Sequence, residues 1–263
     1  MSKNTSSLKN LFNYRDLLFT WTYRIIRARY QQSLLGGLWA IIVPAASTVI
    51  FSIIFTLFVP INTGGPPYIV FSYAAMVPWT LFSSSIGDMV ESLTGNMNLV
   101  SKIYFPREIL PVSALLARLV DTMISFSLLG VLMAYYHIEV NFLWLLFIPS
   151  LIFIQCCLSL GIGLIGSALN VFYRDIRPIL TLGLQLWFYA SPVIYPLNAV
   201  PESLRFLYSL NPMVSVIETY RSILLSQQVP GQMMLLSGVI AFGVLVFGYW
   251  FFKRVEFQFA DVI

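Results

Sequence analysis

The sequence contains a stretch of 58 residues, 30–87, without a single Asp, Glu, Lys, Arg or His. A helix that crosses a bilayer needs about 20 predominantly apolar residues. The stretch is therefore long enough for two spans, and the segment PINTGGPP at 60–67 is where the chain is expected to turn between them. Charged residues make up only 10% of the whole sequence, compared with about 25% in soluble domains. These features predict an all-α membrane protein whose function is exercised in or across a bilayer.

Six apolar stretches are predicted to be transmembrane helices. They cover residues 38–59, 68–86, 112–136, 142–170, 179–195 and 232–252. Of the 15 Lys and Arg residues, 12 then lie on the side of both termini, two (Arg205 and Arg221) lie on the opposite side, and Arg118 lies within the third span. Because cytoplasmic segments carry the excess of Lys and Arg, both termini are predicted to face the cytoplasm. The protein is expected to be a multi-pass component of the cytoplasmic (inner) membrane.

The segments outside the spans predict further elements. Residues 1–37 are expected to form a cytoplasmic lead and an amphipathic interfacial helix, because apolar side chains such as Leu18 and Trp21 share one face of a helical pattern. Anchoring to anionic lipids and a functional role at the cytoplasmic mouth are both open for this helix. Residues 38–263 are expected to form one domain. Within it the outer segment 196–231 is unusually apolar, and it is predicted to dip into the outer leaflet as short re-entrant helices between spans five and six.

The cytoplasmic loop 87–110 is too long for a simple helix connection, which usually takes about two to eight residues. It contains an apolar face at helical spacing, made of Met89, Leu93 and Met97, with a polar border that includes Asp88 and Glu91. A helix of this kind needs a surface to dock against. The headgroups of the inner leaflet are the alternative to a protein partner.

Two ionisable residues lie within the predicted third span. Either residue alone would cost about 2.5–3.5 kcal/mol at the bilayer centre on an insertion scale. Arg118 and Asp121 are three residues apart, so they share a helix face and can pair. This spacing favours a structural ion pair, and a proton or ion relay is the alternative.

Aromatic residues gather in the first and fifth predicted spans. They are Phe51, Phe55 and Phe58 in the first, and Trp187, Phe188, Tyr189 and Tyr195 in the fifth. The apolar C–H face of a sugar ring stacks on an aromatic ring, so an aromatic path suits a glycan that must slide without deep binding wells. The alternative is an ordinary lipid-facing aromatic belt.

Few residues suit enzymatic chemistry or a cofactor. The sequence has no Walker A motif, its single histidine, His137, has no partner for a metal site, and the adjacent Cys156 and Cys157 are predicted to be reduced, buried thiols. No metal and no cofactor are expected. The basic residues are spread over four segments at span ends, which is not the pattern of a nucleic-acid-binding patch.

Five motifs in order along the chain resemble those of a known family. They are RYQQSLLGGLWA at 29–40 with Pro44, NLVSKIYFPRE at 98–108, NVFYRDI at 170–176, SPVIY at 191–195 and Asn211-Pro212. Together they resemble the permease subunits of ATP-binding-cassette exporters for polysaccharides such as O-antigen, capsule and teichoic acid. The resemblance covers nearly the whole chain, whereas each motif alone is weak.

The resemblance implies a homodimer of permeases, docked to two copies of an ATPase subunit, that exports a lipid-linked glycan. The chain itself would not be an enzyme, because the separate subunit hydrolyses ATP. A coupling helix within 87–102 would carry the docking residues Asp88, Met89, Glu91, Leu93 and Met97. The cytoplasmic mouth would be formed by Arg29, Tyr30, Ser33, Gly36 and Trp39. A channel between protomers would be lined by Phe51, Phe55, Phe58, Trp187, Tyr189 and Tyr195.

Other functions remain open at this point. An exporter of a smaller lipid or a drug could use the same fold. A proton-coupled secondary transporter could use Arg118 and Asp121. A membrane-embedded transferase is disfavoured because the sequence lacks an acidic metal-binding cluster.

Overall fold

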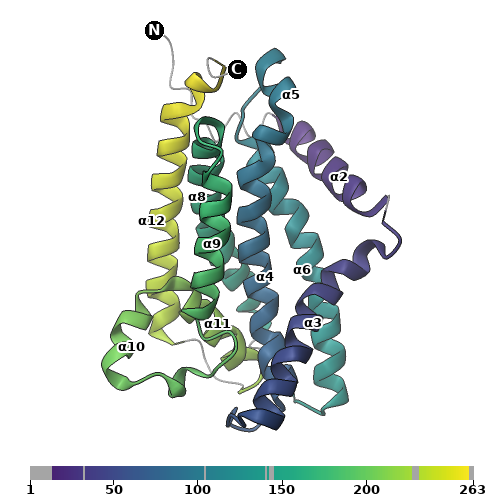
Figure 1. Ribbon diagram of the computed structural model, residues 1–263, viewed down its shortest axis with the longest axis vertical. Coiled ribbons are helices and arrows are strands. Elements are labelled where there is room, and N and C mark those ends of the chain that lie inside the picture. Colours follow the sequence, from purple (N-terminus) through teal and green to yellow (C-terminus); the bar gives the residue numbers. More distant parts are fainter. Residues whose placement is uncertain are drawn as a thin grey trace.

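The computed structural model describes residues 14–31, 33–103, 105–139, 141, 145–226 and 231–260. Within these residues the chain forms ten α-helices and no β-strand, which confirms the all-α prediction. Four long helices stand side by side along the long axis, namely α4 (Tyr68–Ser92), α6 (Ile109–Tyr135), α8 (Ile148–Phe172) and α12 (Gln232–Val255) (Figure 1). In the described residues, five helical segments are long and apolar enough to cross a membrane: Gly36–Phe58, Tyr68–Ser92, Ile109–Tyr135, Ile148–Phe172 and Met233–Phe259.

The segment predicted as the fifth span, 179–195, contains a shorter helix, α9 (Ile176–Tyr189). Its 14 residues extend over about 21 Å at 1.5 Å per residue, which is less than the roughly 30 Å of a hydrocarbon core. After α9 the chain forms turns at 190–195 instead of continuing as a helix. Helix α9 contacts both α4 and α8 and runs along the bundle beside them (Figure 1), so it lies where a span was predicted without having the length of one.

The first span is an irregular helix. It begins with the 3-10 turn η1 (Gly36–Leu38), continues as α3 (Trp39–Ile53) and ends in the π-helical turn η2 (Ile54–Phe58). Gly36 has a φ of 48°, a backbone conformation that glycine adopts without a steric penalty, and it makes the change of direction into α3 possible. The turn predicted at 60–67 is confirmed, because this segment connects η2 to α4.

Helix α4 occupies the centre of the bundle. In its most apolar window 78% of the residues are buried, compared with 11% for the first span, because α3, α6, α8 and α11 all pack against it. Helices α8 and α12 are also in close contact. A Cβ atom added at Gly161 of α8 would lie 2.6 Å from the backbone carbonyl of Val244 in α12. Such close approach through small residues is typical of helices that pack in membranes.

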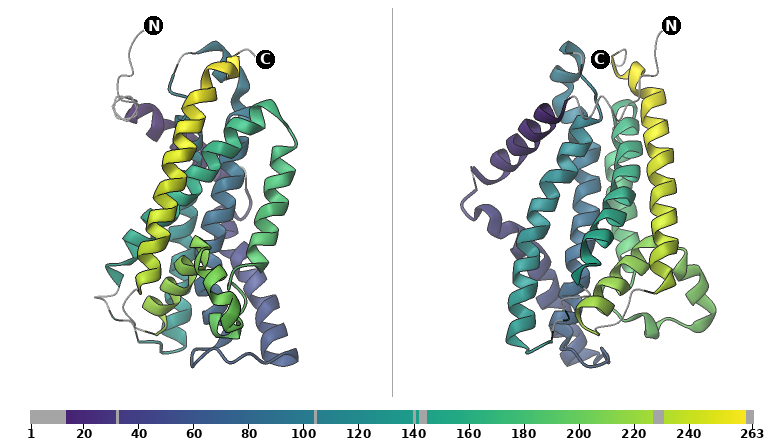
Figure 2. Two further views of the ribbon diagram at one scale, coloured as in Figure 1. Left: turned by 90° about the vertical axis from the view of Figure 1, so that its left-hand side faces the viewer. Right: turned by 180° about the vertical axis from the view of Figure 1, so that it is seen from behind.

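The outer segment forms two short helices, α10 (Glu202–Ser209) and α11 (Pro212–Leu224), at one end of the bundle (Figures 1 and 2). The predicted break at Asn211-Pro212 is confirmed, and Asn211 caps α11 by accepting a hydrogen bond from the Met213 N–H at 3.0 Å. Helix α11 is buried, whereas α10 is exposed. Arg221 of α11, which is 3% exposed, donates to the carbonyl groups of Pro192 and Val193 at 2.6 and 2.7 Å. These hydrogen bonds hold the turn that follows α9 against α11.

The opposite end of the bundle carries α2 (Arg15–Gln31), α5 (Met97–Lys102) and the 3-10 turn η5 (Glu256–Ala260) (Figures 1 and 2). Helix α2 runs obliquely along the outside of the bundle and contacts α6. Its predicted amphipathic pattern is confirmed in part, since Leu18 and Trp21 pack against a buried apolar cluster while Arg24 is exposed. The predicted lead at 1–13 lies outside the described residues.

Candidate functional site between α2, α3, α4 and α6

Four charged side chains and a tyrosine from three helices meet inside the bundle. This charged cluster consists of Arg29 and Tyr30 of α2, Asp88 of α4, and Arg118 and Asp121 of α6. Arg118 donates to the two Asp88 oxygens at 2.6 and 2.8 Å and to Asp121 at 3.1 Å. Arg29 bridges the same carboxylates, at 2.7 Å to Asp88 and with its other terminal nitrogen to Asp121. The Tyr30 hydroxyl also donates to Asp121.

The charged cluster is largely removed from solvent, and its formal charges cancel. The exposed fractions of its four charged side chains lie between 11% and 27%. Burial, together with the hydrogen bond to Asp121, raises the pKa of Tyr30 to about 12, so this hydroxyl stays a donor at neutral pH. The predicted pairing of Arg118 with Asp121 is confirmed. Because each carboxylate contacts both guanidinium groups, the geometry favours a structural role over a proton relay.

The position of Asp88 corrects the role predicted for it. Helix α4 continues through Ser92, so Asp88 lies on the last turns of a long helix and faces α2 and α6 instead of bordering a docking surface. The sequence contains a signal for this placement, because Thr80, Ser84 and Asp88 follow one another at intervals of four and share one face of α4. The contact with Arg29 has no comparable signal, since that residue lies on a separate helix.

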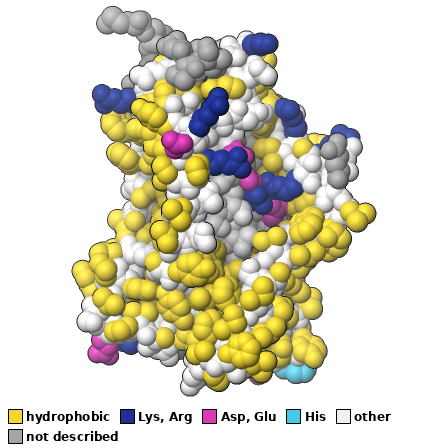
Figure 3. Space-filling model, viewed as in Figure 1, with side chains coloured by type: hydrophobic (Ala, Val, Ile, Leu, Met, Phe, Trp, Pro, Cys, Tyr) yellow, Lys and Arg dark blue, Asp and Glu magenta, His cyan; other side chains and the backbone are white. Residues whose placement is uncertain are grey.

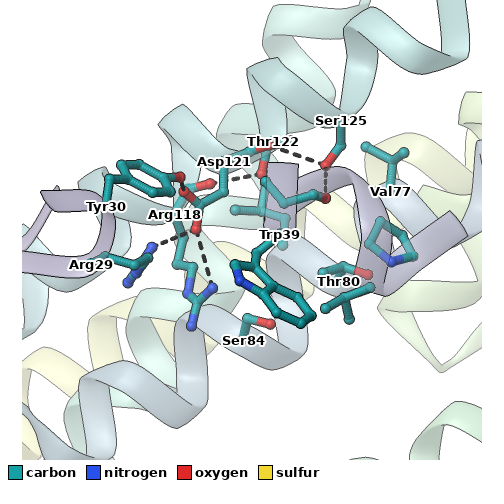
Figure 4. Close-up of a pocket in the computed structure, with 14 residues that line it drawn as sticks. Arg29, Tyr30, Trp39, Val77, Thr80, Ser84, Arg118, Asp121, Thr122 and Ser125 are labelled. Carbon is teal, nitrogen blue, oxygen red and sulfur yellow. Dashed lines mark hydrogen bonds and ion pairs between the residues drawn. The ribbon is translucent and has the colours of Figure 1, made fainter. Parts of the chain in front are cut away.

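A cavity of about 260 Å³ adjoins the charged cluster (Figure 4). Residues of the charged cluster form its polar wall. The apolar part of its lining comes from α3 and α4 and includes Val43, Pro44, Val77 and Leu81. In Figure 3 basic and acidic side chains gather at the edge of a hollow on the face of the molecule that carries α3 and α9. The cavity therefore combines fixed charges, an apolar wall and an opening to the surface.

Three of the five residues predicted at the cytoplasmic mouth line this cavity, namely Arg29, Tyr30 and Trp39. The other two shape the turn that leads into α3. The Ser33 hydroxyl accepts a hydrogen bond from the N–H of Gly36 at 3.2 Å, which stabilises the turn at the positive φ of Gly36. The predicted group is thus brought together as a cavity wall and the turn beside it.

The predicted aromatic residues form a series of ring contacts between α3 and α9. The ring centroid of Phe51 lies 6.4 Å from that of Phe55 and 6.0 Å from that of Phe188, which lies 5.3 Å from Tyr189. Phe58 and Tyr189 are 73% and 54% exposed. The contact between Phe51 and Phe188 is the one point at which these ring contacts join the first predicted span to α9.

Trp187 and Tyr195 make hydrogen bonds to the outer segment. The indole N–H of Trp187 donates to Asn211 Oδ1 at 2.9 Å, and the hydroxyl groups of Tyr195 and Tyr208 are 2.8 Å apart. In this conformation both side chains connect α9 and the turn after it to α10 and α11. Their position on an aromatic path stays a prediction.

Two of the residues predicted to dock a partner subunit are buried within the chain itself. Met89 and Leu93 are both 0% exposed, because α4 continues past the predicted span end and directs them into the core. Side chains that are buried within their own chain are not available to insert into a partner, so the predicted docking role of these two residues is corrected. Glu91 is exposed and pairs with Arg177 at 2.7 Å, and Met97 is half-buried against an apolar cluster.

A second polar contact, the C-terminal clamp, joins the loop before α6 to the end of α12. Its residues are Arg107, Glu108, Lys253 and Glu256. The Lys253 ammonium lies 2.8 Å from Glu108, which is 1% exposed, and 2.9 Å from Glu256. Arg107 donates to the backbone carbonyl of Glu256. The clamp holds η5 beside the loop that connects α5 to α6, and sequence reasoning did not predict it.

The side chains that line the cavity suit noncovalent recognition of a ligand. Fixed guanidinium and carboxylate groups stand beside hydroxyl and indole donors. In the described part of the chain, no group of three or more His, Cys, Asp or Glu side chains is placed to hold a metal ion. Cys156 and Cys157 are free thiols.

Comparison with known proteins gives consistent matches along the chain. Residues 16–225 match the family model described as ABC-2 type transporter. The chain is 33% identical over 225 residues to the O-antigen export system permease protein RfbA of Myxococcus xanthus, with 85% of each chain covered. It is 27% identical over 260 residues to RfbA of Klebsiella pneumoniae, covering 98% of this chain and 100% of the relative. It is also 30% identical over 205 residues to the polysialic acid transport protein KpsM of Escherichia coli, covering 75% and 77%.

Proposed function

The chain belongs to the ABC-2 type transporter family, and from this premise we propose that it is the permease of an exporter for a polysaccharide of the O-antigen or capsular class. It is the membrane component, and a separate ATPase subunit hydrolyses ATP. The observation that carries the substrate class is the match to an O-antigen export permease over 98% of this chain and 100% of that relative. The polar cavity supports it, because polar and ionisable residues within membrane helices are costly and mark substrate pathways.

We further propose that the cargo is a lipid-linked glycan and that the exporter contains two copies of this chain and two ATPase subunits. The exposed apolar surface supports a second copy. No residue of α9 is buried within the chain, and only 11% of the first-span window is buried. These helices lie on the face into which the cavity opens (Figure 3). A second copy on this face would enclose a path between protomers, with the aromatic residues of α3 and α9 along it.

The proposed topology has six crossings and cytoplasmic termini in the inner membrane. Helix α9 and the turns at 190–195 would together complete the short crossing. Two observations support this arrangement: α2 and the end of α12 lie at the same end of the bundle (Figure 2), and basic residues concentrate in the segments assigned to that side. The buried helix α11 would be the re-entrant part of the outer segment.

We place the ATPase contact on the exposed surface of α5, where Asn98, Ser101 and Lys102 are exposed. The buried Leu93, which lies in the same apolar cluster as Val100 of α5, would support this helix from within the chain instead of inserting into the partner. Interfaces depend on a few anchors within a larger contact surface, so substitutions on this face should separate ATPase binding from folding.

Gene deletion followed by complementation tests the proposed function. Deletion should abolish polysaccharide at the cell surface and leave lipid-linked polymer inside, and the wild-type chain together with its ATPase should restore surface polymer. Surface polysaccharide that persists in the deletion strain would contradict the proposal. Export that continues without any ATPase but depends on a proton gradient would establish a secondary transporter instead.

A further inference from the structure

We propose that the cavity beside the charged cluster seats a single neutral sugar ring of the exported chain. This inference rests on the proposed function and deepens it, because it names the side chains within one protomer that contact the polymer. Four observations carry it: the volume of the cavity, its aromatic wall, its unused hydrogen-bond donors and the balance of its charges.

The volume admits a small ligand only. Sites for drug-sized molecules typically measure about 300–1,000 Å³, and this cavity measures about 260 Å³. An oligosaccharide or a lipid chain would extend far beyond it. One ring of a polymer can occupy the cavity while the rest of the chain continues through its opening.

Trp39 supplies an aromatic wall. Its side chain is half-exposed, and the indole lies beside Ser84 and Thr80 at one side of the cavity (Figure 4). The axial C–H groups of a pyranose ring form an apolar patch that packs flat on an aromatic ring. The opposite edge of such a sugar carries hydroxyl groups, which need polar partners.

Donors for those hydroxyl groups are present and unused. Among the described residues, the side chains of Trp39, Thr80 and Ser84 have no hydrogen-bond partner. Neighbouring hydroxyl groups are satisfied, since Ser83 donates to the Trp79 carbonyl at 3.0 Å and Ser125 donates to the Ala40 carbonyl at 2.7 Å. Trp39 is half-exposed and Thr80 and Ser84 are only partly buried, so these groups stay open to solvent or to a ligand that enters the cavity. The unused donors therefore fit a ligand that brings its own acceptors.

The charges favour a neutral ligand over an anion. Arg118 directs its Nε and both terminal nitrogens to carboxylates, and both terminal nitrogens of Arg29 do the same. A phosphate group would meet two carboxylates and no uncommitted guanidinium group, whereas a sugar hydroxyl can donate to Asp121 without disturbing the ion pairs. Sugar recognition of this kind needs both donors and acceptors, and the cavity wall contains both.

A protection experiment tests the inference directly. The complex of permease and ATPase is reconstituted in lipid nanodiscs with Cys156→Ala and Cys157→Ala, and Ser84→Cys adds one thiol at the cavity wall. Ser209→Cys, on the exposed helix α10, is the matched control. The rate of modification by a small water-soluble methanethiosulfonate is measured alone, with short oligosaccharides from mild acid hydrolysis of the polysaccharide that the host strain exports, and with inorganic phosphate.

The oligosaccharides should slow modification of the thiol at position 84 and leave the control unchanged, and phosphate should have no effect. Thr80→Val, which keeps the shape and removes a donor, should raise the half-protecting concentration by about two- to tenfold. Trp39→Ala should raise it more than Trp39→Phe, which keeps an aromatic face.

Three results would overturn the inference: protection by phosphate instead of oligosaccharide, no protection by oligosaccharide in a complex that exports polysaccharide, or a thiol at position 84 that never reacts. All three leave the proposed function intact. Failure of the wild-type chain to restore surface polysaccharide would overturn the proposed function itself, so the two failures are distinguishable.

Discussion

Exchanging the two charges of α6 tests whether the whole charged cluster or only the pair of Arg118 with Asp121 stabilises this region. In the double variant Arg118→Asp/Asp121→Arg the exchanged side chains still attract each other. The carboxylate at 118, however, would face Asp88, and the guanidinium at 121 would face Arg29. Two of the four ion pairs in the cluster would become contacts between like charges. An isolated pair would tolerate the exchange, whereas the cluster should not.

The expected loss of stability follows from how deeply the charged side chains of the cluster are buried. Removing one partner from a buried ion pair costs about 3–5 kcal/mol, and solvent screening lowers the value for exposed pairs. Because the four side chains are between 11% and 27% exposed, we expect the double variant to lose about 3 kcal/mol or more of stability. Folded domains are stable by only about 5–15 kcal/mol, so the loss should be large. Adding Arg29→Asp and Asp88→Arg makes all four contacts attractive again and should restore most of the stability.

Thermal unfolding of the purified permease in detergent measures both effects. The matched control is Glu202→Arg/Arg205→Glu, which exchanges an exposed pair at the same i,i+3 spacing and should change the unfolding temperature little. A double variant in α6 that unfolds at the wild-type temperature would refute the reasoning. So would a fourfold variant that is no more stable than the double variant.

The remaining predictions concern packing, docking, the C-terminal clamp and topology. Gly161→Leu should separate α8 from α12 and reduce folded yield, whereas Gly243→Ala, whose added Cβ would meet no atom within 4 Å, should be tolerated in the same purification. Ser101→Trp, on the exposed face of α5, should leave the permease folded but lower the amount of co-purified ATPase, and unchanged co-purification would argue against this docking surface. Lys253→Met removes the ammonium that contacts the buried carboxylate of Glu108, so it should lower stability by about 3–5 kcal/mol in thermal or chemical unfolding; a loss below about 1 kcal/mol would show that the clamp is dispensable. A reporter inserted at 60–67 should be external and one after residue 263 cytoplasmic, and finding both on the same side would indicate five crossings instead of six.

Much of the fold could be predicted from the sequence because the decisive properties are local. The length of an uncharged stretch determines whether one helix can cross a membrane, and the proline after Asn211 ends one helix where the next begins. The fifth span was overestimated because its apolar composition continues through Pro192 and Tyr195, although the backbone forms turns there. The composition of a segment indicates whether it prefers lipid or water, and it does not indicate where a helix within that segment ends.

The candidate site could be predicted only where its residues share a helix. Arg118 and Asp121 are three residues apart, so spacing alone pairs them. Asp88 lies 30 residues from Arg118, and Arg29 lies 92 residues from Asp121, so their meeting depends on how α2 and α4 pack. Leu93 was assigned to an external surface for a related reason: an apolar helix face indicates that something covers it, and the covering element here is the same chain.

The C-terminal clamp has a consequence for biosynthesis. Helix α12 is the last α-helix of the described residues, and η5 directly follows it. The hydrogen bond from Arg107 to Glu256 joins residues 149 positions apart. Since membrane chains are made from the N-terminus onward, the loop beside α5 is translated long before the segment that holds it in place. A ribosome-bound or truncated chain would therefore present an unfinished surface at this end of the bundle, and under the docking proposed above only a completed chain would offer the ATPase its full contact. The same dependence makes the end of α12 a poor place for a rigid fusion partner, because a displacement there would be transmitted to the loop that connects α5 to α6.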